Sequence, residues 1–305
     1  MKKAAEWIDL ALMRRFQDEG TDAHRLCTAH DGWVERFGPD ILISYKNAAA
    51  RERLTTELYS WQKSVEFAFL RVLARFLPKK NEEREKPLLI FGDREASLET
   101  MVTENHLNFK VDFAAGYSAG FFLDQRENRR YLRQVPPRRL LNCFAYTCSF
   151  SVAAAAAGAK TVSLDLSQKS LARGRENFAL NNLPTSDHQF IADDVLAVLP
   201  GLARRGEKFD AIILDPPTFS RTHRGKPFHV EKDFENLLAS ALELIERDGR
   251  ILLSTNCSTL DDKGLEGMAR YCLKLTRKAG KFYRTPSLPD FPLGAAARTI
   301  WLTLR

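Results

Sequence analysis

The chain has 305 residues, of which 44% are hydrophobic and 28% charged, and its formal net charge is +7. The length allows one large α/β domain and a smaller module, and no apolar run approaches the roughly 20 residues of a membrane span. The first residues do not form a signal-peptide pattern, and no two of the five cysteines have C-x-x-C spacing. We therefore expect a cytoplasmic protein with no membrane contact and no bound metal, whose basic charge is compatible with a polyanionic partner.

The first 115 residues predict an N-terminal helix followed by a small α+β domain. Apolar side chains at helical spacing indicate one helix over residues 4–18 and another over residues 57–77. Short strands are predicted at residues 24–28, 33–37, 41–45, 88–91 and 108–113. We assign residues 1–20 to the helix and residues 21–115 to the small domain.

Residues 116–305 predict a doubly wound α/β domain, because strands and helices alternate from about residue 138 onward. Such alternation implies a parallel sheet with right-handed crossovers. Ligands of these sheets bind at the carboxyl ends of the strands, near the point where the strand order reverses. The predicted strands are residues 139–144, 161–165, 188–192, 209–214, 250–255 and 298–304.

The turns after the first three strands carry the first candidate ligands. A turn of small residues leads from the first strand into the Ala-rich helix 152–157, although glycine, its usual occupant, is absent until Gly158. Asp165 ends the second strand, where it can accept hydrogen bonds from ribose hydroxyls or cap the next helix. Asp193 and Asp194 follow the third strand, where a carboxylate can receive an adenine amino group or belong to an ordinary turn.

The fourth strand ends in Asp215-Pro216-Pro217-Thr218-Phe219, which puts a carboxylate at the edge of the sheet. The two prolines hold the backbone in a rigid, non-helical wall, and Phe219 offers a face on which a planar base can stack. A purely structural turn is the alternative interpretation. The pattern favours a site for a planar acceptor beside the sheet.

The fifth strand leads to Cys257 at the same edge. A thiolate there can attack C6 of a pyrimidine, which makes C5 nucleophilic enough to take a methyl group from a sulfonium. A lone cysteine is more often a small buried hydrophobic residue. Both interpretations stay open on spacing alone.

Basic residues form two clusters along the chain. The first contains six arginines within residues 126–139 and is either a set of solvated helix and loop side chains or a phosphate-binding surface. The second, Arg221, His223, Arg224 and Lys226, follows the Asp-Pro-Pro motif directly and contains no acid. For this second cluster we favour contact with phosphate.

The segment from Gly120 to Arg129 resembles the G-[FY]-[FY]-L-D-Q-R-x-x-R signature of bacterial S-adenosylmethionine-dependent 23S rRNA methyltransferases, the cytosine-C5 enzymes and their relatives. Residues 103–106, followed by a strand, are similar to the E-E-H segment of the family's small middle domain. The likeness covers roughly residues 20–305 and is strongest from residue 103 onward. Further motifs follow in the family's order at residues 142–150, 164–167, 192–195, 214–219 and 254–258.

The resemblance implies a class I, Rossmann-like methyltransferase domain with a seven-stranded, mostly parallel sheet, a small α+β domain that binds substrate or RNA, S-adenosylmethionine as cofactor and 23S rRNA as partner. It assigns Gln125 and Arg126 to the methionine end of the cofactor, Asp165 to the ribose, and Asp194, with Asp193 as a second carboxylate, to the adenine. The implied cofactor-binding residues are Phe122, Gln125, Arg126, Asn142, Phe144, Tyr146, Asp165, Leu166, Asp193, Asp194 and Asp215. The implied substrate-binding residues are Pro216, Pro217, Phe219, Arg221, Arg224 and Lys226, and the implied catalytic residues are Cys257 and Asp215.

Three departures from the family pattern keep alternatives open. Cys148 and Ser149 replace the usual glycine pair, Thr218 replaces the lysine of the cytosine enzymes as in the related guanine-N7 domain, and the N-terminal RNA-binding domain of the cytosine enzymes is not recognised. Our first hypothesis is an rRNA cytosine-C5 methyltransferase with Cys257 as covalent nucleophile. The alternatives are the same fold methylating guanine N7 or N2, a non-catalytic RNA-binding or assembly protein and, last, a protein methyltransferase. The oligomeric state is not predicted.

Overall fold

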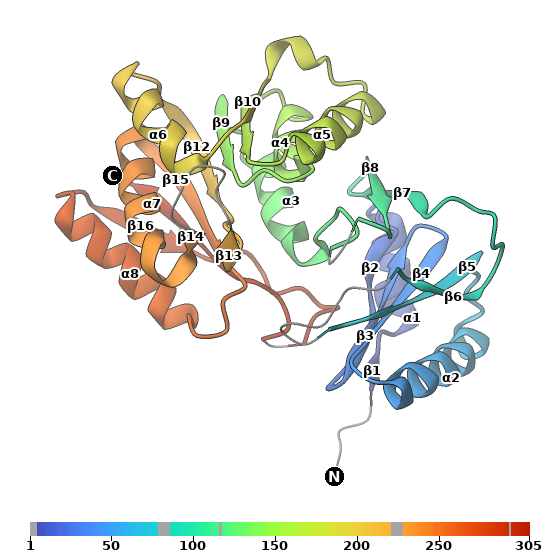
Figure 1. Cartoon of the computed structure of the whole chain (residues 1–305). Coiled ribbons are helices and arrows are strands. Elements are labelled where there is room, and N and C mark those ends of the chain that lie inside the picture. The colour runs from blue at the N-terminus through green and yellow to red at the C-terminus, as the bar shows by residue number, and fades with distance from the viewer. Residues whose placement is uncertain (1–4, 79–85, 116–117, 221–227, 293) are drawn as a thin grey trace. The chain divides into compact units, whose positions relative to one another are not determined.

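The structure, a computed structural model, describes residues 5–78, 86–115, 118–220, 228–292 and 294–305 (Figure 1). The chain divides into two compact units. Unit 1 contains Met1–Arg126 and Leu288–Leu293, and unit 2 contains Glu127–Ser287 and Gly294–Arg305. The division falls after residue 126 instead of the predicted 115, and unit 1 takes in a short segment from near the end of the chain.

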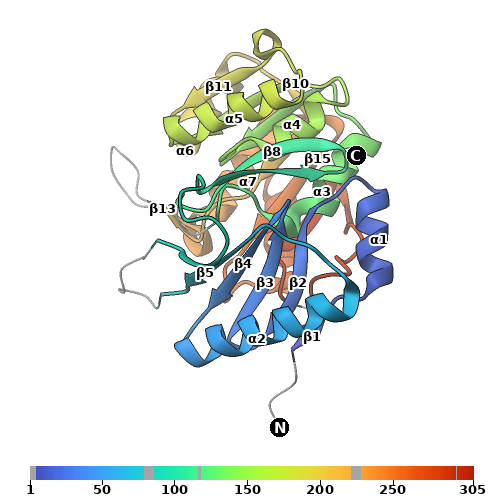
Figure 2. The same cartoon turned by 90° about the vertical axis from the view of Figure 1, so that its right-hand side faces the viewer.

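Unit 1 is built on a six-stranded sheet with the order β1-β2-β3-β4-β5-β6. Only β4 and β5 pair in parallel, and the long helix α2 (Ala48–Val65) makes the crossover that this pairing needs. Figure 2 shows α2 beside the sheet, where its buried Leu54 and Leu58 join the core formed with Ile41 and Ile43. The strands are β1 (Glu6–Trp7), β2 (Ala23–Ala29), β3 (Gly32–Phe37), β4 (Asp40–Tyr45), β5 (Arg71–Phe76) and β6 (Leu88–Phe91).

A shorter helix and a hairpin complete unit 1. Helix α1 (Leu10–Asp18) begins where the Asp9 side chain accepts a hydrogen bond from the backbone N–H of Leu12 at 2.7 Å. Strands β7 (Glu99–Glu104) and β8 (Leu107–Asp112) form the hairpin, and a single 3-10 turn, η1, spans Leu123–Gln125.

The predicted helix over residues 57–77 is correct as far as Val65 and wrong beyond it. Helix α2 starts at the Asn47 cap and ends at Glu66, which has a left-handed backbone with φ of 52°. The apolar residues that follow form the buried strand β5 instead. A short apolar run has no periodicity that separates a buried strand from a buried helix, so the sequence pattern merged two elements into one.

Unit 2 confirms the predicted doubly wound fold. Its seven-stranded sheet has the order β11-β10-β9-β12-β15-β17-β16, in which β17 alone is antiparallel to both of its neighbours. The strands are β9 (Arg139–Cys143), β10 (Lys160–Asp165), β11 (Gln189–Ala192), β12 (Phe209–Leu214), β15 (Ile245–Thr255), β16 (Gly280–Tyr283) and β17 (Arg298–Leu304). The helices are α3 (Arg126–Gln134), α4 (Ser149–Ala155), α5 (Gln168–Leu180), α6 (Val195–Arg204), α7 (Val230–Leu244) and α8 (Asp262–Leu275), with a 3-10 turn η2 (Thr185–Asp187).

Alternate side chains of β12 bury into opposite faces of the sheet. Ile212 and Leu214 join the core under α6, α7 and α8, whereas Ala211 and Ile213 pack with residues of α3 and α4. Helices therefore cover both faces, and the strand order reverses between β9 and β12. Among the described helices, none combines the length and the hydropathy that a membrane crossing requires.

Candidate functional site

Strand register brings the predicted motifs of unit 2 to one edge of the sheet. Leu214 at the end of β12 pairs with Cys143 of β9 and with Leu253 of β15, and Cys143 also pairs with Leu164 of β10. The next residue of each strand is therefore at the same level. This places Phe144, Asp165 and Asp215 side by side at the carboxyl edge, around the point where the strand order reverses.

The loop after β9 has the backbone of a glycine-rich turn without containing glycine. Phe144, Tyr146 and Cys148 have left-handed φ values of 59°, 48° and 61°. Each such conformation costs on the order of 1 kcal/mol for a residue with a side chain. Hydrogen bonds hold it, because the Ala145 N–H donates to the Leu164 carbonyl at 3.0 Å and the Cys148 N–H donates to the Ala145 carbonyl at 2.8 Å.

The side chain of Cys148 is buried against helix α5. A Cβ atom placed on Gly174 would lie 2.4 Å from Cys148 Sγ and 2.9 Å from its Cβ, so this glycine leaves the space that the cysteine fills. Burial raises the pKa of the Cys148 thiol to about 12, which keeps it protonated and unreactive. The replacement of the family's glycine is therefore accommodated inside the protein.

Asp165 links the loop to the second strand. Its Oδ2 accepts the Tyr146 N–H at 2.8 Å and its Oδ1 accepts the Ser167 N–H at 2.8 Å. Burial raises the pKa of Asp165, and these two hydrogen bonds oppose the rise. The alternative that Asp165 caps the next helix is wrong, because Ser167 caps α5 by accepting the Ser170 N–H.

The two aspartates after β11 have different surroundings. Asp194 caps α6, with its Oδ1 accepting the Leu196 N–H at 2.9 Å. Asp193 is exposed, and its Oδ1 accepts the Asp194 N–H at 2.7 Å. Of these two residues, only Asp193 has an exposed carboxylate that does not cap a helix.

Other predicted cofactor residues of unit 2 have partners inside the protein. The Asn142 amide is buried and donates to Ser151 Oγ at 2.9 Å, and Ser151 in turn lies 2.8 Å from Ser163 Oγ. The Phe144 ring is half-buried, with its centroid 5.6 Å from that of Phe228. Leu166 and Tyr146 are also half-buried. Asn142 therefore ties α4 to the sheet from within.

Three predicted cofactor residues, Phe122, Gln125 and Arg126, belong to unit 1. Arg126 is fully buried and forms two hydrogen bonds with Asp290, from Nη2 to Oδ1 at 2.5 Å and from Nη1 to Oδ2 at 3.2 Å. Its guanidinium also lies over the Phe16 ring, 4.5 Å from the centroid. The structure thus gives Arg126 a carboxylate partner within the protein, and its cofactor role stays a prediction.

The first arginine cluster contains both buried and exposed side chains. Arg126 and Arg129 are buried, and the Arg129 guanidinium lies 5.9 Å from the Phe150 centroid. Arg138 and Arg139 pair with Glu246 and Glu207 at 2.6 and 2.7 Å, respectively. For Arg126 and Arg129 both interpretations made from the sequence were wrong, because these side chains are buried. Arg138 is exposed and Arg139 partly exposed, as the first interpretation expected, and they pair with carboxylates far away along the chain.

The Asp-Pro-Pro segment presents a rigid step beside the sheet. Asp215 is half-buried, Pro216 is buried and Pro217 is exposed. Phe219 starts the short strand β13 (Phe219–Ser220), which pairs with β14 (Phe228–His229), and its side chain is 48% exposed. The basic residues Arg221, Arg224 and Lys226 lie outside the described residues.

Cys257 lies just beyond β15 in a cluster that the sequence did not reveal. Its Sγ is 3.0 Å from the Thr259 hydroxyl and 3.6 Å from Oε1 of Glu231, and Thr259 also donates to Glu231. Cys257 is only 3% exposed, whereas Glu231 is exposed in the first turn of α7. The hydrogen bonds from Thr259 and Cys257 lower the pKa of Glu231. Glu231 stands 26 residues before the cysteine in no motif, so the sequence offered no signal for it.

The chemistry of this edge fits the expected S-adenosylmethionine. Asp165 and Asp193 supply acceptors for hydroxyl and amino groups, and the loop from Phe144 to Cys148 adopts the left-handed backbone that is typical of a glycine-rich turn. Within the described part of the chain, no group of three or more His, Cys, Asp or Glu side chains is arranged to hold a metal ion.

Known proteins share both the sequence and the fold. Residues 93–302 match the family described as S-adenosylmethionine-dependent methyltransferase. The ribosomal RNA large subunit methyltransferase I of Aeromonas salmonicida is 31% identical over 308 residues, covering 97% of this chain and 76% of that protein. The protein of the same name from Shigella boydii serotype 18 is 31% identical over 268 residues, covering 85% of this chain and 66% of that protein.

A crystal structure of a methyltransferase complexed with SAH superimposes with a TM-score of 0.82 and 26% sequence identity, covering 96% of this chain and 78% of that one. The family match spans more than half of the chain, and the fold agrees with it. The chain therefore belongs to the S-adenosylmethionine-dependent methyltransferases, and S-adenosylmethionine is its cofactor.

Proposed function

We propose that this protein methylates large-subunit ribosomal RNA in the cytoplasm. The likeness to the Aeromonas salmonicida protein carries the proposal, since it covers 97% of this chain and that protein's name gives large-subunit ribosomal RNA. The net charge of +7 supports a polyanionic substrate. The exposed Phe219 beside the Asp-Pro-Pro wall supports a planar base as the acceptor.

The residues of unit 2 would hold the cofactor by its polar groups. Asp165 would accept the ribose hydroxyls with the lone pairs that Tyr146 and Ser167 leave available. Asp193 would accept the adenine amino group, because Asp194 is engaged as the cap of α6. When bound, S-adenosylmethionine supplies an electrophilic methyl group on a sulfonium.

For the acceptor we propose C5 of a cytosine, with Cys257 as the nucleophile. The thiol proton would pass to Glu231, directly or through the Thr259 hydroxyl, and Sγ would form a bond to C6 of the base. The electron pair of the C5–C6 double bond then moves to C5, which becomes the methyl acceptor. Loss of the C5 proton to water then restores the C5–C6 double bond as the C6–Sγ bond breaks, and the departing thiolate takes back the proton from Glu231. Asp215 and Phe219 would hold the flipped-out base against the sheet edge.

A guanine nitrogen is the second candidate acceptor, and the burial of Cys257 favours it. The cysteine is 3% exposed and belongs to the main core cluster of unit 2. In that case the lone pair of the base attacks by itself, and Cys257 only packs. The non-catalytic alternative loses its support, because it depended on the glycine-poor loop, whose backbone has the left-handed conformation that glycine would provide.

Two measurements test this proposal. Mass spectrometry of rRNA nucleosides from a deletion strain should show loss of one methylated nucleoside, and an unchanged rRNA would overturn the rRNA assignment. In vitro, Cys257→Ala should bind the cofactor with unchanged affinity in calorimetry but form no 5-methylcytidine. Cys272→Ala is the matched control, because Cys272 is equally buried, on α8, and should keep its activity. Continued 5-methylcytidine formation by Cys257→Ala would refute the nucleophile, and methylguanosine as the product would establish the second candidate.

A further inference from the structure

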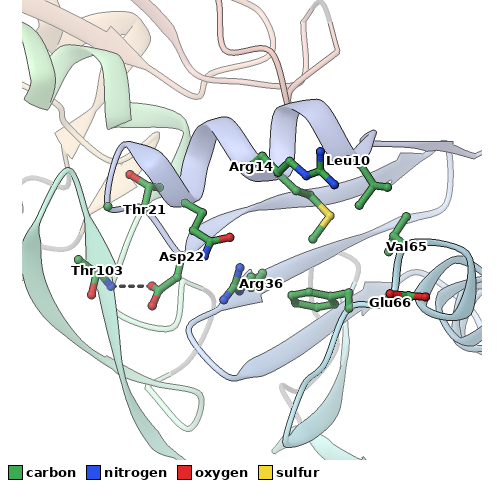
Figure 3. Close-up of a pocket in the computed structure, with 12 residues that line it drawn as sticks. Leu10, Arg14, Thr21, Asp22, Arg36, Val65, Glu66 and Thr103 are labelled. Atoms are coloured by element: carbon green, nitrogen blue, oxygen red, sulfur yellow. Dashed lines mark hydrogen bonds between the residues drawn. The ribbon is translucent and has the colours of Figure 1, made fainter.

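Unit 1 contains a cavity of about 600 Å³ that the proposed chemistry does not use. Figure 3 shows it between helix α1, which contributes Leu10 and Arg14, and the residues Asp22, just before β2, and Arg36 of β3. Its volume lies in the range of small-ligand sites, which hold one drug-sized or nucleotide-sized molecule. The lining is mixed, with apolar residues such as Leu10 and Val65 next to charged residues such as Arg14 and Glu66.

Arg36 and Phe67 of the cavity lining form a cation–π pair, which we call the Arg36–Phe67 platform. The Arg36 guanidinium lies over the Phe67 ring, 5.0 Å from its centroid, and Arg36 Nε donates to the Gly38 carbonyl at 2.9 Å. These two contacts orient the planar guanidinium and leave its terminal nitrogens without a hydrogen bond to any other described residue. Stacked guanidinium and aromatic planes are what unpaired nucleobases bind in RNA complexes.

Polar side chains around the platform can bind the base edge and the phosphate of a nucleotide. Asp22 Oδ1 accepts the Thr103 N–H at 2.6 Å, which fixes the carboxylate and leaves Oδ2 as an acceptor beside the Arg36 donors. Donor and acceptor together match the edge of a base, which presents both. Arg14 is exposed on α1 and has no ion pair within the described residues, so it can meet a phosphate. Glu66 lies at the opposite side of the cavity and would repel one there.

We propose that this cavity binds one unpaired nucleotide of the RNA substrate, with the base on the Arg36–Phe67 platform and a flanking phosphate on Arg14. The inference rests on the proposed function, because RNA is the proposed substrate. It gives unit 1 a defined task, which is to capture a single-stranded position of the RNA apart from the nucleotide that is methylated. Free nucleoside monophosphate has the same chemistry, and only a continuous strand would gain from the further phosphates beside it.

The test measures binding of fluorescently labelled single-stranded RNA to the full-length protein by anisotropy. Arg14→Ala should weaken binding about tenfold and lower the salt dependence by about one phosphate contact. Arg15→Ala is the matched control, because Arg15 is the next residue on the same helix, is exposed, and pairs with Glu19 at 3.1 Å. Arg36→Lys keeps the charge but removes the planar stack, and it should weaken binding about tenfold with little change in the salt dependence.

Crosslinking gives an independent readout. RNA that contains 5-iodouridine should crosslink to a peptide that includes Phe67, and adenosine monophosphate at the same concentration should compete poorly. Equal effects of Arg14→Ala and Arg15→Ala, or no crosslink in unit 1, would overturn the inference while RNA methylation by the wild type continues. Complete competition by the free monophosphate would show a small-molecule site and overturn it as well. Failure of the wild type to methylate any RNA would instead remove the proposed function.

Discussion

The contact between Cys148 and Gly174 allows a quantitative test of how the glycine-poor loop is accommodated. Gly174→Ala would put a methyl group 2.4 Å from Cys148 Sγ and 2.9 Å from its Cβ. Overpacking of this kind costs about 1–3 kcal/mol, whereas alanine in place of glycine inside a helix contributes about 1 kcal/mol. We expect Gly174→Ala to destabilise the protein by about 1 kcal/mol.

The same substitution should stabilise the protein when Cys148 is glycine. Cys148→Gly removes both close atoms and leaves the Thr147 carbonyl carbon as the nearest atom, at an ordinary contact distance of 3.5 Å. The helix-propensity gain of about 1 kcal/mol then stands alone, so the two sites should be coupled by about 2 kcal/mol. Cys148→Gly alone should change stability little, because relief of the left-handed backbone offsets the lost burial.

Urea denaturation of the four proteins measures this coupling directly. Calorimetry with S-adenosylmethionine should follow the same pattern, with affinity reduced in Gly174→Ala and restored in the double variant. The reasoning would be refuted if Gly174→Ala changed the unfolding free energy equally, within about 0.5 kcal/mol, in both backgrounds.

Three further predictions concern single side chains. Asp193→Ala should weaken cofactor binding about tenfold in calorimetry. Asp194→Ala should lower the unfolding free energy by about 1 kcal/mol, because the α6 cap is lost, and should leave cofactor affinity unchanged. The reverse pattern would exchange the roles of the two aspartates. Glu231→Gln should reduce kcat by about 10²-fold or more without changing cofactor affinity. Because hydrogen bonds lower the pKa of Glu231, the kcat of the wild type should fall only at a pH below the ordinary glutamate range. An unchanged kcat in Glu231→Gln would exclude Glu231 as the base for Cys257. Burial lowers the pKa of His24 from 6.5 to about 3, so the unfolded chain binds a proton in this window that the folded chain does not. The neutral His24 does not lower the free energy of unfolding above pH 6.5, but this free energy falls by about 1.4 kcal/mol per pH unit as the pH falls from 6.5 toward 3. Unfolding curves of His24→Phe should lack this fall.

The sequence predicted the strands of unit 2 because a strand buried on both faces is a continuous apolar run between polar turns. Residues 209–214 match β12 at both ends, and Asp165 and Asp215 could be placed at the sheet edge from strand ends alone. Strands with weak patterns escaped detection. The exposed and alternating β7 and β16 were missed, and β15 begins at Ile245, before the polar residues that concealed its start.

The partners of the charged side chains could not be predicted. Arg126 and Asp290 are 164 residues apart, and Arg138 and Glu246 are 108 apart, so no local pattern connects them. Cys257 was identified from its motif, but Glu231 and Thr259 depend on how α7 begins beside the end of β15. Sequence patterns locate the ends of strands, whereas the pairing of ions depends on the completed fold.

Because Arg126 pairs with Asp290, unit 1 cannot complete its fold until Asp290 has been synthesised. Asp290 accepts the Arg25 backbone N–H at 3.0 Å in addition to binding Arg126, so the core of unit 1 includes a carboxylate from near the end of the chain. The ribosome adds Asp290 only after all of unit 2 except residues 294–305 has been made. Removing one partner of a buried ion pair costs about 3–5 kcal/mol, so unit 1 should be less stable until Asp290 has been made and can neutralise the buried Arg126. A fragment that ends at residue 126 should for the same reason be unstable, and any attempt to produce unit 1 alone must graft residues 288–293 back onto it.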